Sequence, residues 1–565
     1  KNGAGKNVRV GAYKSLYGTD PQQTKQAAHT KMNKLLTLHD PAQARHYYDQ
    51  GLWRTDTFYS LVANHAKTRP GAFALRDSRH RLTWRELVDW VDAVAAALHD
   101  AGLRKGDRVA LWLGNRVEAI VAFLACARNG YVCNPSLHPN YTNDEIRTLL
   151  TNIKAAAVFT DNEDGELDKV AALPAMKRIF GPDGFPVPGT GTPPAADQNA
   201  DRICYLAFTS GTTGTPKGVM HSHNTLLANP RDMVRDWHHD ANTVLLSLSP
   251  FNHHIAWVSL GQILVCGGEL VVNDPPAGMK PLDWIVATGA TYVMGVPTHA
   301  MDILADQKSR GMDRIGNVSV FYMAGAPIPR ATAQAFLDQG IKPQNIYGMT
   351  ENSSHQYTFP TDDPATITAT CGRGGPSYEV RIFSQDNAGD ELPQGEVGQI
   401  GGRGACLMLG YFANQTATEE SFNRDGWFLS GGLGRIDANG CLEIVGRLKD
   451  VIIRGGHNIH PAKIEDLAIK HAAIAKAAAF AVPDERLGEK VGLAIIPNGD
   501  APDAQSVLAH LYDSGLTVQD MPEYFIAMDA LPLTASGKIL KRALAQWAKA
   551  GRITPAPVRF KRPQS

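Results

Sequence analysis

The chain has 565 residues, 43% of them apolar and 20% charged, which is typical of a globular protein too long for a single core. Lysine plus arginine and aspartate plus glutamate number 56 each, so no net charge attracts nucleic acid or an anionic membrane. The chain has no apolar run of about 18 residues, which excludes stable membrane insertion through a spanning helix.

Residues 1–50 are polar and weakly patterned, and we expect them to lie across the surface as an N-terminal arm without chemistry of their own. The pattern sharpens after this arm. Apolar residues at helical spacing predict a helix over 82–98, followed by a strand at 109–113, a helix at 117–128 and a strand at 131–134. This alternation predicts a mostly parallel sheet with helices on its faces.

The most distinctive stretch follows a short apolar run at 203–208, which predicts a buried strand. The next ten residues hold three glycines and four threonines, and Lys217 adds a positive charge. Consecutive amides in such a loop form a concave anion site, so we interpret it as a phosphate cradle rather than a flexible surface loop. It is not a Walker A loop, because Pro216 precedes the lysine and no Ser or Thr follows it. The candidate residues are Thr209, Ser210, Gly211, Thr212, Thr213, Gly214 and Lys217.

After this loop the sequence again predicts alternating strands and helices. Helices are expected between the next strands, one of them beginning at Pro329. In open α/β sheets, ligands bind beyond the carboxyl ends of the strands, and the polar motifs that follow fall at such ends. The expected strands are 243–248, 268–273, 291–296, 318–323 and 343–347.

The motif at 345–351 is a strand that ends in an aromatic residue, a glycine and a carboxylate. Tyr347 offers a face on which adenine can stack, and Glu351 is a hard oxygen ligand of the kind that Mg²⁺ prefers. Taken alone, such a string is more often a capped turn. Its candidate site residues are Tyr347, Gly348, Met349, Thr350 and Glu351.

A second domain of α+β type is predicted from residue 449 to the end of the chain. Helices are expected near 462–472 and 503–513, and strands near 477–482 and 491–496. Close to its end, the string at 532–541 places Lys538 on a glycine-containing turn ahead of a basic amphipathic helix. Taken alone, Lys538 would be read as a solvated surface lysine.

Together, the strings at 209–218, 345–351, 426–437, 446–450 and 532–541 closely resemble the signatures of the AMP-forming adenylate enzymes. These comprise acyl-CoA synthetases, free-standing adenylation domains and beetle luciferases. The chain most resembles acyl-CoA ligases of the medium-chain or cyclohexanecarboxylate type. The resemblance implies a large α/β N-terminal domain at 51–448, with parallel-rich sheets covered by helices, and a small mobile α+β lid domain at 449–565.

The resemblance also implies roles at the nucleotide. The glycine-threonine loop would hold the β- and γ-phosphates of ATP, while Thr350 and Glu351 would face the phosphates and Mg²⁺. Arg447 would contact the ribose and a phosphate. The string Gly325, Ala326 and Pro327 would line the other side of the adenine; its alternative is a tight turn before a helix.

Further roles implied by the resemblance concern the acid and the thiol. His253 would border the carboxylate or the gate of the acyl pocket, although one histidine at a turn is more often structural. Lys449 would be the hinge, and Gly455 and Gly456 would lie beside the pantetheine tunnel of coenzyme A. Lys538 would bridge the carboxylate and the α-phosphate, stabilising charge that develops during attack. The apolar helix after His253, with Trp257, either walls the acyl pocket or fills the core.

One position departs from the family pattern. The family has Thr-Gly-Asp where this chain has Ser430, Gly431 and Gly432, and the missing aspartate accepts hydrogen bonds from the ribose hydroxyls. Losing such a bond costs about 1.5–3 kcal/mol. Three accounts remain open: another group supplies the acceptor, the substitution inactivates the chain, or the protein adenylates poorly by nature. On the sequence alone, Gly432→Asp is expected to tighten ATP binding.

The function that the resemblance implies is ATP-dependent activation of a carboxylic acid to an acyl-adenylate, followed by transfer to coenzyme A. Coenzyme A is the expected acceptor because no carrier-protein domain follows the last signature. The alternatives are a free-standing enzyme that loads a carrier protein and a low-turnover nucleotide-binding homologue. Seven scattered cysteines without a CxxC pair favour reduced thiols in the cytoplasm over a disulfide framework or a zinc site. A homodimer and a lysine acetyltransferase that modifies Lys538 are further candidate partners.

Overall fold

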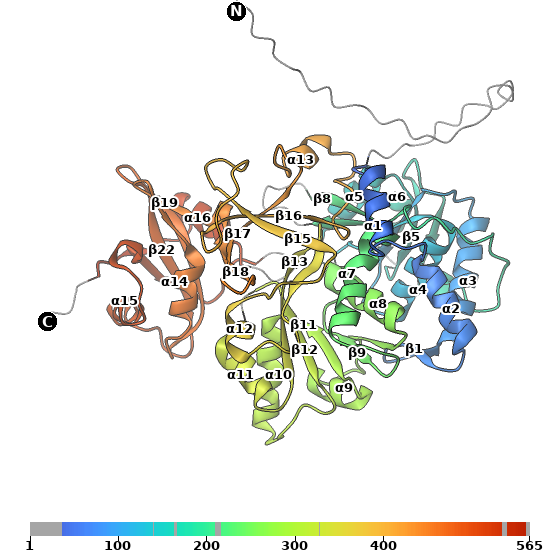
Figure 1. Cartoon of the computed structure of the whole chain (residues 1–565), viewed down its shortest axis with the longest axis horizontal. Helices are drawn as coiled ribbons and strands as arrows, with labels where there is room; N and C mark the ends of the chain where they lie inside the picture. The colour runs from blue at the N-terminus through green and yellow to red at the C-terminus, as the bar shows by residue number, and fades with distance from the viewer. Residues whose placement is uncertain are drawn as a thin grey trace, which may run out of the picture. The chain divides into compact units, whose positions relative to one another are not determined.

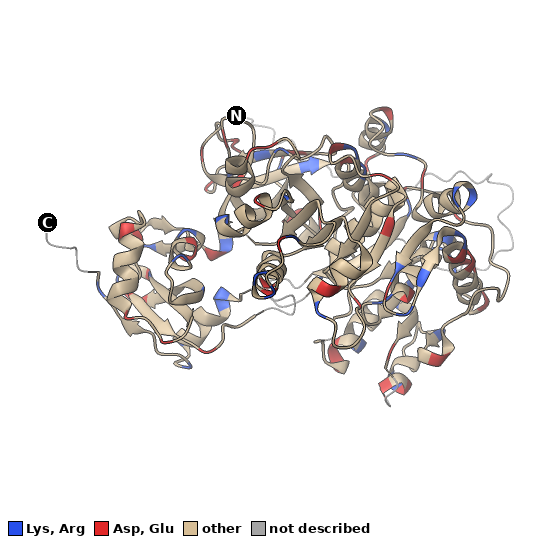
Figure 2. Ribbon diagram, turned by 90° about the horizontal axis from the view of Figure 1, so that it is seen from below, with Lys and Arg blue, Asp and Glu red and all other residues tan. Residues whose placement is uncertain are grey.

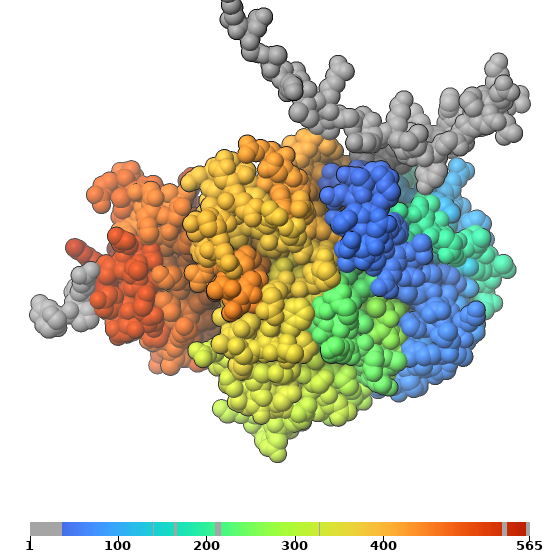
Figure 3. Space-filling view, viewed as in Figure 1, coloured from blue at the N-terminus to red at the C-terminus, as the bar shows by residue number. Residues whose placement is uncertain are grey.

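The computed structural model describes residues 37–138, 140–162, 166–209, 216–326, 328–533 and 539–560 (Figure 1). Most of the predicted N-terminal arm lies outside these residues. Its last part is a helix, α1 (Pro41–Asp49), which the Asp40 carboxylate caps by accepting a hydrogen bond from the amide of Ala42 at 2.7 Å. In the space-filling view these dark-blue residues lie against the yellow and green residues (Figure 3), and Ala44 is buried there with Trp53.

A six-stranded sheet contains the predicted phosphate-loop strand. Its strand order is β6-β5-β3-β4-β7-β8, and its pairs are parallel except for the antiparallel pair β7/β8. The strand–helix–strand unit predicted at 109–134 is confirmed, with α4 (Val117–Asn129) as its helix. The strands are β3 (Arg108–Trp112), β4 (Val132–Asn134), β5 (Ala155–Thr160), β6 (Arg178–Phe180), β7 (Ile203–Thr209) and β8 (Lys217–Ser222).

An eight-stranded sheet contains all five strands predicted between residues 243 and 347. Its order is β14-β13-β12-β11-β9-β10-β1-β2; the six strands from β13 to β1 pair in parallel, and the edge strands β14 and β2 are antiparallel. The strands are β1 (Phe73–Arg76), β2 (Arg81–Thr83), β9 (Val244–Ser247), β10 (Glu269–Val272), β11 (Tyr292–Gly295), β12 (Val320–Ala324), β13 (Lys342–Met349) and β14 (Ser353–Tyr357).

Helix α4 lies within the apolar core, because all 13 of its residues are buried. Its Phe123 ring lies 5.1 Å from Phe58 of α2 (Phe58–Thr68) and 4.5 Å from Trp257 of α8 (His254–Cys266). Trp257 is 2% exposed and donates from its indole nitrogen to the carbonyl of Phe251. This tryptophan is therefore part of the apolar core.

Other helices cover the two sheets, and the structure confirms those predicted at 82–98 and from Pro329. Thr83 caps the first of them with a capping box to Glu86. The helices are α3 (Trp84–Asp100), α5 (Asn143–Ile153), α6 (Glu166–Ala171), α7 (His223–Asp236), α9 (Pro281–Thr288), α10 (Pro297–Ser309), α11 (Arg330–Leu337), α12 (Pro364–Ala369) and α13 (Gln415–Glu419).

Two further sheets follow along the chain. The first is antiparallel in the order β15-β16-β17-β18. In the second, β22 pairs with β21, β19 and β23, and the predicted α+β character of this part is confirmed. The strands and helices are β15 (Tyr378–Phe383), β16 (Gly398–Gly404), β17 (Phe428–Ile436), β18 (Leu442–Arg447), β19 (Ile452–Arg454), β20 (His457–Ile459), β21 (Ile474–Asp484), β22 (Gly488–Pro497), β23 (Tyr524–Ala527), β24 (Ala556–Pro557), α14 (Pro461–Ala468), α15 (Ala504–Asp513) and α16 (Lys541–Lys549).

The distribution of the charged residues and the state of the cysteines agree with the composition of the chain. Basic and acidic residues are interspersed along the ribbon (Figure 2). All seven cysteines are free, and six of them are buried. Among the described residues, no helix combines the length and the apolarity needed to cross a bilayer.

Candidate active site

The predicted phosphate loop connects two antiparallel strands, since β7 ends opposite the beginning of β8 with Thr209 facing Lys217. The Thr209 hydroxyl donates to the carbonyl of Lys217 at 3.5 Å. A strand rather than a helix follows the loop, which agrees with its distinction from a Walker A loop. The loop residues themselves lie outside the described residues: Ser210, Gly211, Thr212, Thr213 and Gly214.

Strand β8 is held by a second segment, residues 409–412. Backbone bonds of 2.7 to 3.1 Å join Gly218 to Phe412, and Met220 to Leu409 and Gly410. This pairing places the ammonium group of Lys217 4.7 Å from the centre of the Tyr411 ring, a cation–π distance.

The same tyrosine reaches the predicted metal ligand. The Tyr411 hydroxyl donates to Oε1 of Glu351 at 2.9 Å, and the Glu351 carbonyl accepts from the amide of Met408. Burial, with the Glu351 charge as the second cause, raises the pKa of Tyr411, which keeps the hydroxyl protonated as the donor. Lys217, Tyr411 and Glu351 therefore form one connected line from the phosphate loop to the carboxylate, although their motifs lie about 130 residues apart in the sequence.

A buried histidine makes a second connection between the two motifs. His221 on β8 approaches the carbonyl of Thr350 with Nε2 at 2.7 Å and the hydroxyl of Thr225 with Nδ1 at 3.0 Å. A carbonyl only accepts, so Nε2 carries the proton and Nδ1 accepts from the threonine. Burial lowers the pKa of His221 to about 4, so the ring is neutral at pH 7.

Strand β13 requires glycine near its end, where the chain turns towards β14. A Cβ atom at Gly348 would lie 1.8 Å from the carbonyl oxygen of Ser353, so no other residue fits this approach. Met349 pairs with Ser353 across the turn, and Asn352 accepts from the amide of Met349 through its side chain. The turn therefore holds Tyr347, Thr350 and Glu351 at fixed positions around it.

Tyr347 lies close to Gly432, the position at which the chain departs from the family pattern. Gly432 pairs with Arg447 between β17 and β18, and a Cβ atom on Gly432 would lie 2.6 Å from the Tyr347 hydroxyl oxygen. That hydroxyl donates to Oγ of Ser430 at 2.9 Å, and Ser430 in turn donates to the carbonyl of Ile400. Burial raises the pKa of Tyr347 to about 12. The Tyr347–Ser430 hydrogen bond thus occupies the space in which a side chain at 432 would begin.

The residues predicted to flank adenine lie beside Tyr347. Strand β12 runs parallel to β13, with Ala324 opposite Ile346, so Gly325 and Ala326 continue next to Tyr347. Both are exposed, and Gly325 has a φ of 88°, which favours glycine. Pro327 lies outside the described residues.

Two adjacent histidines differ in their contacts. His253 immediately precedes α8, and its ring lies 5.4 Å from that of His138. His254 lies with Nδ1 3.2 Å from the Tyr205 hydroxyl and Nε2 3.1 Å from Oγ of Ser353. Its ring also stacks on His221 at 5.6 Å, and burial with that neighbour lowers the pKa of His254.

The remaining predicted residues belong to the last part of the chain. Arg447 is exposed at the end of β18, and Lys449 is exposed in the short 3₁₀ turn Leu448–Asp450 that follows. Gly455 and Gly456 form the exposed turn between β19 and β20, with φ of 58° and 87°. Lys538 lies outside the described residues.

The sequence interpretation missed four residues that connect the motifs: His221, Tyr411, Ser430 and His254. His221 stands four residues after Lys217 on the same face of β8, so alternation along a predicted strand would have found it. No local signal identifies Tyr411, because its role depends on backbone pairing with a strand about 190 residues earlier.

Comparisons with known proteins find relatives along most of the chain. The family model described as AMP-binding enzyme matches residues 62–412, and the AMP-binding enzyme C-terminal domain matches 463–538. A feruloyl-CoA synthase from Amycolatopsis sp is 33% identical over 85% of this chain and 97% of its own length. A medium-chain fatty-acid–CoA ligase from Escherichia coli K12 is 28% identical over 91% and 94%. The crystal structure of ATP-bound MatB from Rhodopseudomonas palustris superposes with a TM-score of 0.79 at 28% identity, covering 87% of this chain and 99% of that one.

Proposed function

The chain belongs to the AMP-binding enzyme family, and from this premise we propose how its residues perform the reaction. It is an AMP-forming acid–thiol ligase. In the first step a carboxylate oxygen attacks the α-phosphorus of ATP, the bond to the bridging oxygen breaks, and pyrophosphate leaves. In the second step the thiol sulfur of coenzyme A attacks the acyl carbon, loses its proton, and displaces AMP. The first step needs positioning and neutralisation of charge more than covalent help.

The observation that carries the assignment of the phosphate end is the line Lys217–Tyr411–Glu351. It joins a cation next to the glycine-threonine loop to a buried carboxylate, through contacts of 4.7 and 2.9 Å. Glu351 is a hard oxygen donor, which fits Mg²⁺ bound by one carboxylate together with phosphate oxygens. The ion would neutralise charge on the leaving pyrophosphate. Lys217 and the loop amides would bind the β- and γ-phosphates, and Thr350 would face them.

We assign the adenine end to the neighbouring strand ends of β12 and β13. Tyr347 would stack on one face of the adenine, while Gly325 to Pro327 would line the other. Gly348 and Met349 continue the wall beneath it. Arg447, opposite Gly432, would contact the ribose and a phosphate.

Lys538 would supply the positive charge that bridges the attacking carboxylate and the α-phosphate. Rotation of the C-terminal domain about Lys449 would then withdraw Lys538 and present Gly455 and Gly456 to the pantetheine arm of coenzyme A. Such a hinge switch exchanges two packed arrangements of the same domains.

Position 432 also favours a second candidate function, a homologue that binds nucleotide with little turnover. No carboxylate stands at Gly432, and the Tyr347–Ser430 bond fills the space. Pyrophosphate release without formation of a CoA ester would instead favour transfer to a carrier protein.

We further propose a cytoplasmic location, in keeping with the seven free thiols. A homodimer and acetylation of Lys538 are also proposals.

A panel of carboxylic acids assayed for pyrophosphate and AMP release, with and without coenzyme A, tests the function. Acid-dependent pyrophosphate release and CoA-dependent AMP release are expected. Failure of every acid to release pyrophosphate would contradict the ligase assignment and favour the nucleotide-binding homologue.

Lys538→Ala tests the division of labour between the two steps. Because the lysine would act only while the carboxylate attacks phosphorus, adenylate formation is expected to fall by about a thousandfold while thiolysis of preformed acyl-adenylate is retained. Single-turnover measurements of both half-reactions decide this. Lys549→Ala, at the exposed end of α16, is the matched control. Equal loss of both steps would refute the assignment.

A further inference from the structure

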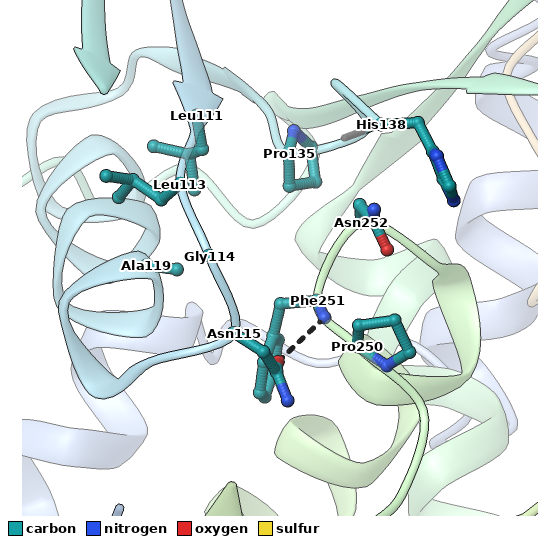
Figure 4. A pocket seen from close by; sticks show the side chains of 10 residues that line it. All are labelled: Leu111, Leu113, Gly114, Asn115, Ala119, Pro135, His138, Pro250, Phe251 and Asn252. Carbon is teal, nitrogen blue, oxygen red and sulfur yellow. Dashed lines mark hydrogen bonds between the residues drawn. The ribbon is translucent and has the colours of Figure 1, made fainter. Parts of the chain in front are cut away.

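A cavity of about 250 Å³ lies between the ends of β3 and β4 and the turn at 250–252 (Figure 4). Its lining is mostly apolar, and the Asn115 side chain is engaged, since it accepts from the amide of Phe251 at 3.1 Å. An apolar chamber of this kind fits many acids and identifies none of them. The described end of the N-terminal arm, by contrast, makes specific polar contacts with the chain that supports the candidate site.

The arm segment, residues 38–54, precedes the residues that the family model matches. Its first and last parts both bond to one short stretch, residues 405–409. The amide of Leu38 donates to the carbonyl of Leu409 at 3.0 Å, and the indole nitrogen of Trp53 donates to the carbonyl of Ala405 at 2.8 Å. The arm therefore holds this stretch at both of its ends.

Trp53 is itself fixed in place. It is 5% exposed, and its ring lies 5.2 Å from that of Tyr47 and 5.9 Å from that of Tyr48. The Tyr48 hydroxyl donates to the carboxylate of Asp201 at 2.9 Å, shortly before β7 begins. Ala405 is fully buried, so loss of the indole donor would leave a buried carbonyl without its partner, which is costly.

The same stretch contacts the turn that carries Glu351. The amide of Met408 donates to the Glu351 carbonyl at 2.7 Å, and the Cys406 thiol lies 3.3 Å from the carbonyl of Asn352. Shortly after the stretch ends, the Tyr411 hydroxyl donates to the Glu351 carboxylate at 2.9 Å. One length of backbone thus joins the arm to both the main chain and the side chain of the proposed metal ligand.

We infer that Trp53 is a positioning residue for Glu351 and acts through residues 405–411. The inference rests on the proposed ligase function, in which Glu351 binds Mg²⁺. This ion requires near-ideal octahedral geometry, so a carboxylate that is held in one position loses less freedom when it binds. Without the Trp53 hydrogen bond, residues 405–411 lose part of their restraint, and the carboxylate adopts positions that suit the ion less well.

Trp53→Phe tests the inference, because it keeps an aromatic ring and removes the indole donor. Hydrogen–deuterium exchange of the ligand-free protein should be at least threefold faster at the amides of residues 405–412. Calorimetry with ATP should show that half-saturation requires about three- to tenfold more Mg²⁺, as the loss of one hydrogen bond allows. Thiolysis of preformed acyl-adenylate, which follows the departure of pyrophosphate, should be unchanged.

Trp90→Phe is the matched control. Trp90 is 8% exposed, and its indole nitrogen donates to the carbonyl of Pro186 at 2.7 Å. This variant should leave the exchange of residues 405–412 and the Mg²⁺ requirement unchanged, even where it lowers the melting temperature. A merely structural role for Trp53 predicts instead that the two variants behave alike.

The other anchor of the arm provides a second pair of variants. The Leu38 side chain is 42% exposed, so substitution there is expected to leave the fold intact. Leu38→Pro removes the amide that donates to Leu409, whereas Leu38→Ala keeps it. Faster exchange at residues 405–412 and a higher Mg²⁺ requirement are expected in Leu38→Pro alone.

An unchanged Mg²⁺ requirement in Trp53→Phe, with or without faster exchange, would overturn the inference, as would an equal increase in Trp90→Phe. If Trp53→Phe does not fold, equal Mg²⁺ requirements in the two Leu38 variants overturn it. A wild type that binds ATP and Mg²⁺ but releases pyrophosphate with no acid would contradict the ligase function alone. The exchange and binding comparisons need no turnover, so they still decide the role of Trp53.

Discussion

The two ends of the candidate nucleotide site differ in how they are built. At the phosphate end, a cation, an aromatic ring and a carboxylate are joined in a line, and backbone pairing between β8 and residues 409–412 fixes their order. At the ribose end, Gly432 carries no side chain, and Tyr347 and Ser430 fill the space with one neutral hydrogen bond.

At the ribose end, the volume of the missing side chain at Gly432 is replaced, but its negative charge is not. The hydroxyl of Tyr347 compensates for the missing side chain in volume, since it lies 2.6 Å from where a Cβ atom would stand. It does not replace the negative charge. We therefore expect the phosphate end to contribute most of the nucleotide-dependent rate, and the ribose end to tolerate change.

The largest effect is expected from Glu351→Gln. The amide still accepts from the Tyr411 hydroxyl, so the local fold is kept while the charge available to Mg²⁺ is lost. ATP–pyrophosphate exchange should fall by about a hundredfold to a thousandfold, and half-saturation should require more Mg²⁺.

Tyr411→Phe provides the graded comparison, because it removes only the hydrogen bond to Glu351. A decrease of about tenfold or less is expected. Equal effects of the two substitutions, or no effect of Glu351→Gln, would break the proposed difference between the ends.

A smaller effect is expected at the ribose end. Gly432→Asp alone would force its Cβ atom against the Tyr347 hydroxyl, so the simple gain in ATP affinity expected from the sequence should not appear. With Tyr347→Phe as background the hydroxyl is absent, and adding Gly432→Asp should tighten ATP binding about tenfold or more through the ribose hydroxyls.

Calorimetry with ATP and with a 2′,3′-dideoxy analogue measures this gain. The gain should vanish with the analogue, which lacks both ribose hydroxyls. Identical ATP affinity in the Tyr347→Phe and double variants would remove position 432 from the ribose contacts.

The hydrogen bond between His221 on β8 and the carbonyl of Thr350 should be visible in the way the free energy of unfolding depends on pH. Folded His221 stays neutral down to about pH 4, whereas in the unfolded chain it binds a proton near pH 6.5. The unfolded state therefore binds more protons in this window. Neutral His221 therefore contributes stability above pH 6.5. This contribution is lost as the pH falls, by at most about 1.4 kcal/mol per pH unit.

Replacing His221 with Gln should lower by one the number of extra protons that the unfolded state binds. The slope of the unfolding free energy against pH should therefore become shallower. Urea unfolding of both proteins at pH 7 and pH 5 measures it, and the difference cancels the contributions of the other buried histidines. Parallel pH profiles for the two proteins would contradict the assignment.

The smallest effect is expected from Ser430→Ala. Tyr347 would lose its hydrogen-bond partner and its fixed ring orientation, and KM for ATP should rise by about two- to fivefold with little change in kcat. Ser309→Ala, on an exposed hydroxyl that donates to the carbonyl of Asp306, is the control. An effect on kcat larger than that on KM would indicate a role beyond positioning.

These regions also show what the sequence could predict. Four of the five strands expected between 243 and 347 are largely apolar runs, as buried parallel strands are, and all five are present. The fifth, at 343–347, contains Gln344 and Asn345 and is not such a run. In the last sheet the predicted strand cores were right but too short, since the β21/β22 pair extends to Asp484 and Gly488.

The contacts between motifs were not predictable. The link from Tyr411 to Glu351 and that from Ser430 to Tyr347 join residues 60 and 83 positions apart, and neither leaves a local pattern. Likewise, the hydrogen bonds that His254 makes with Tyr205 and Ser353 leave no local pattern in the sequence. Such pairings depend on the register between distant strands.

The most direct measurement is a crystal structure of the protein with Mg²⁺ and a non-hydrolysable ATP analogue. We expect adenine between Tyr347 and the Gly325 turn, and the β- and γ-phosphates against the loop that begins at Thr209, with the metal ion on Glu351. A nucleotide bound away from Tyr347, or a metal ion without Glu351 among its ligands, would contradict the assignment of one nucleotide to both ends.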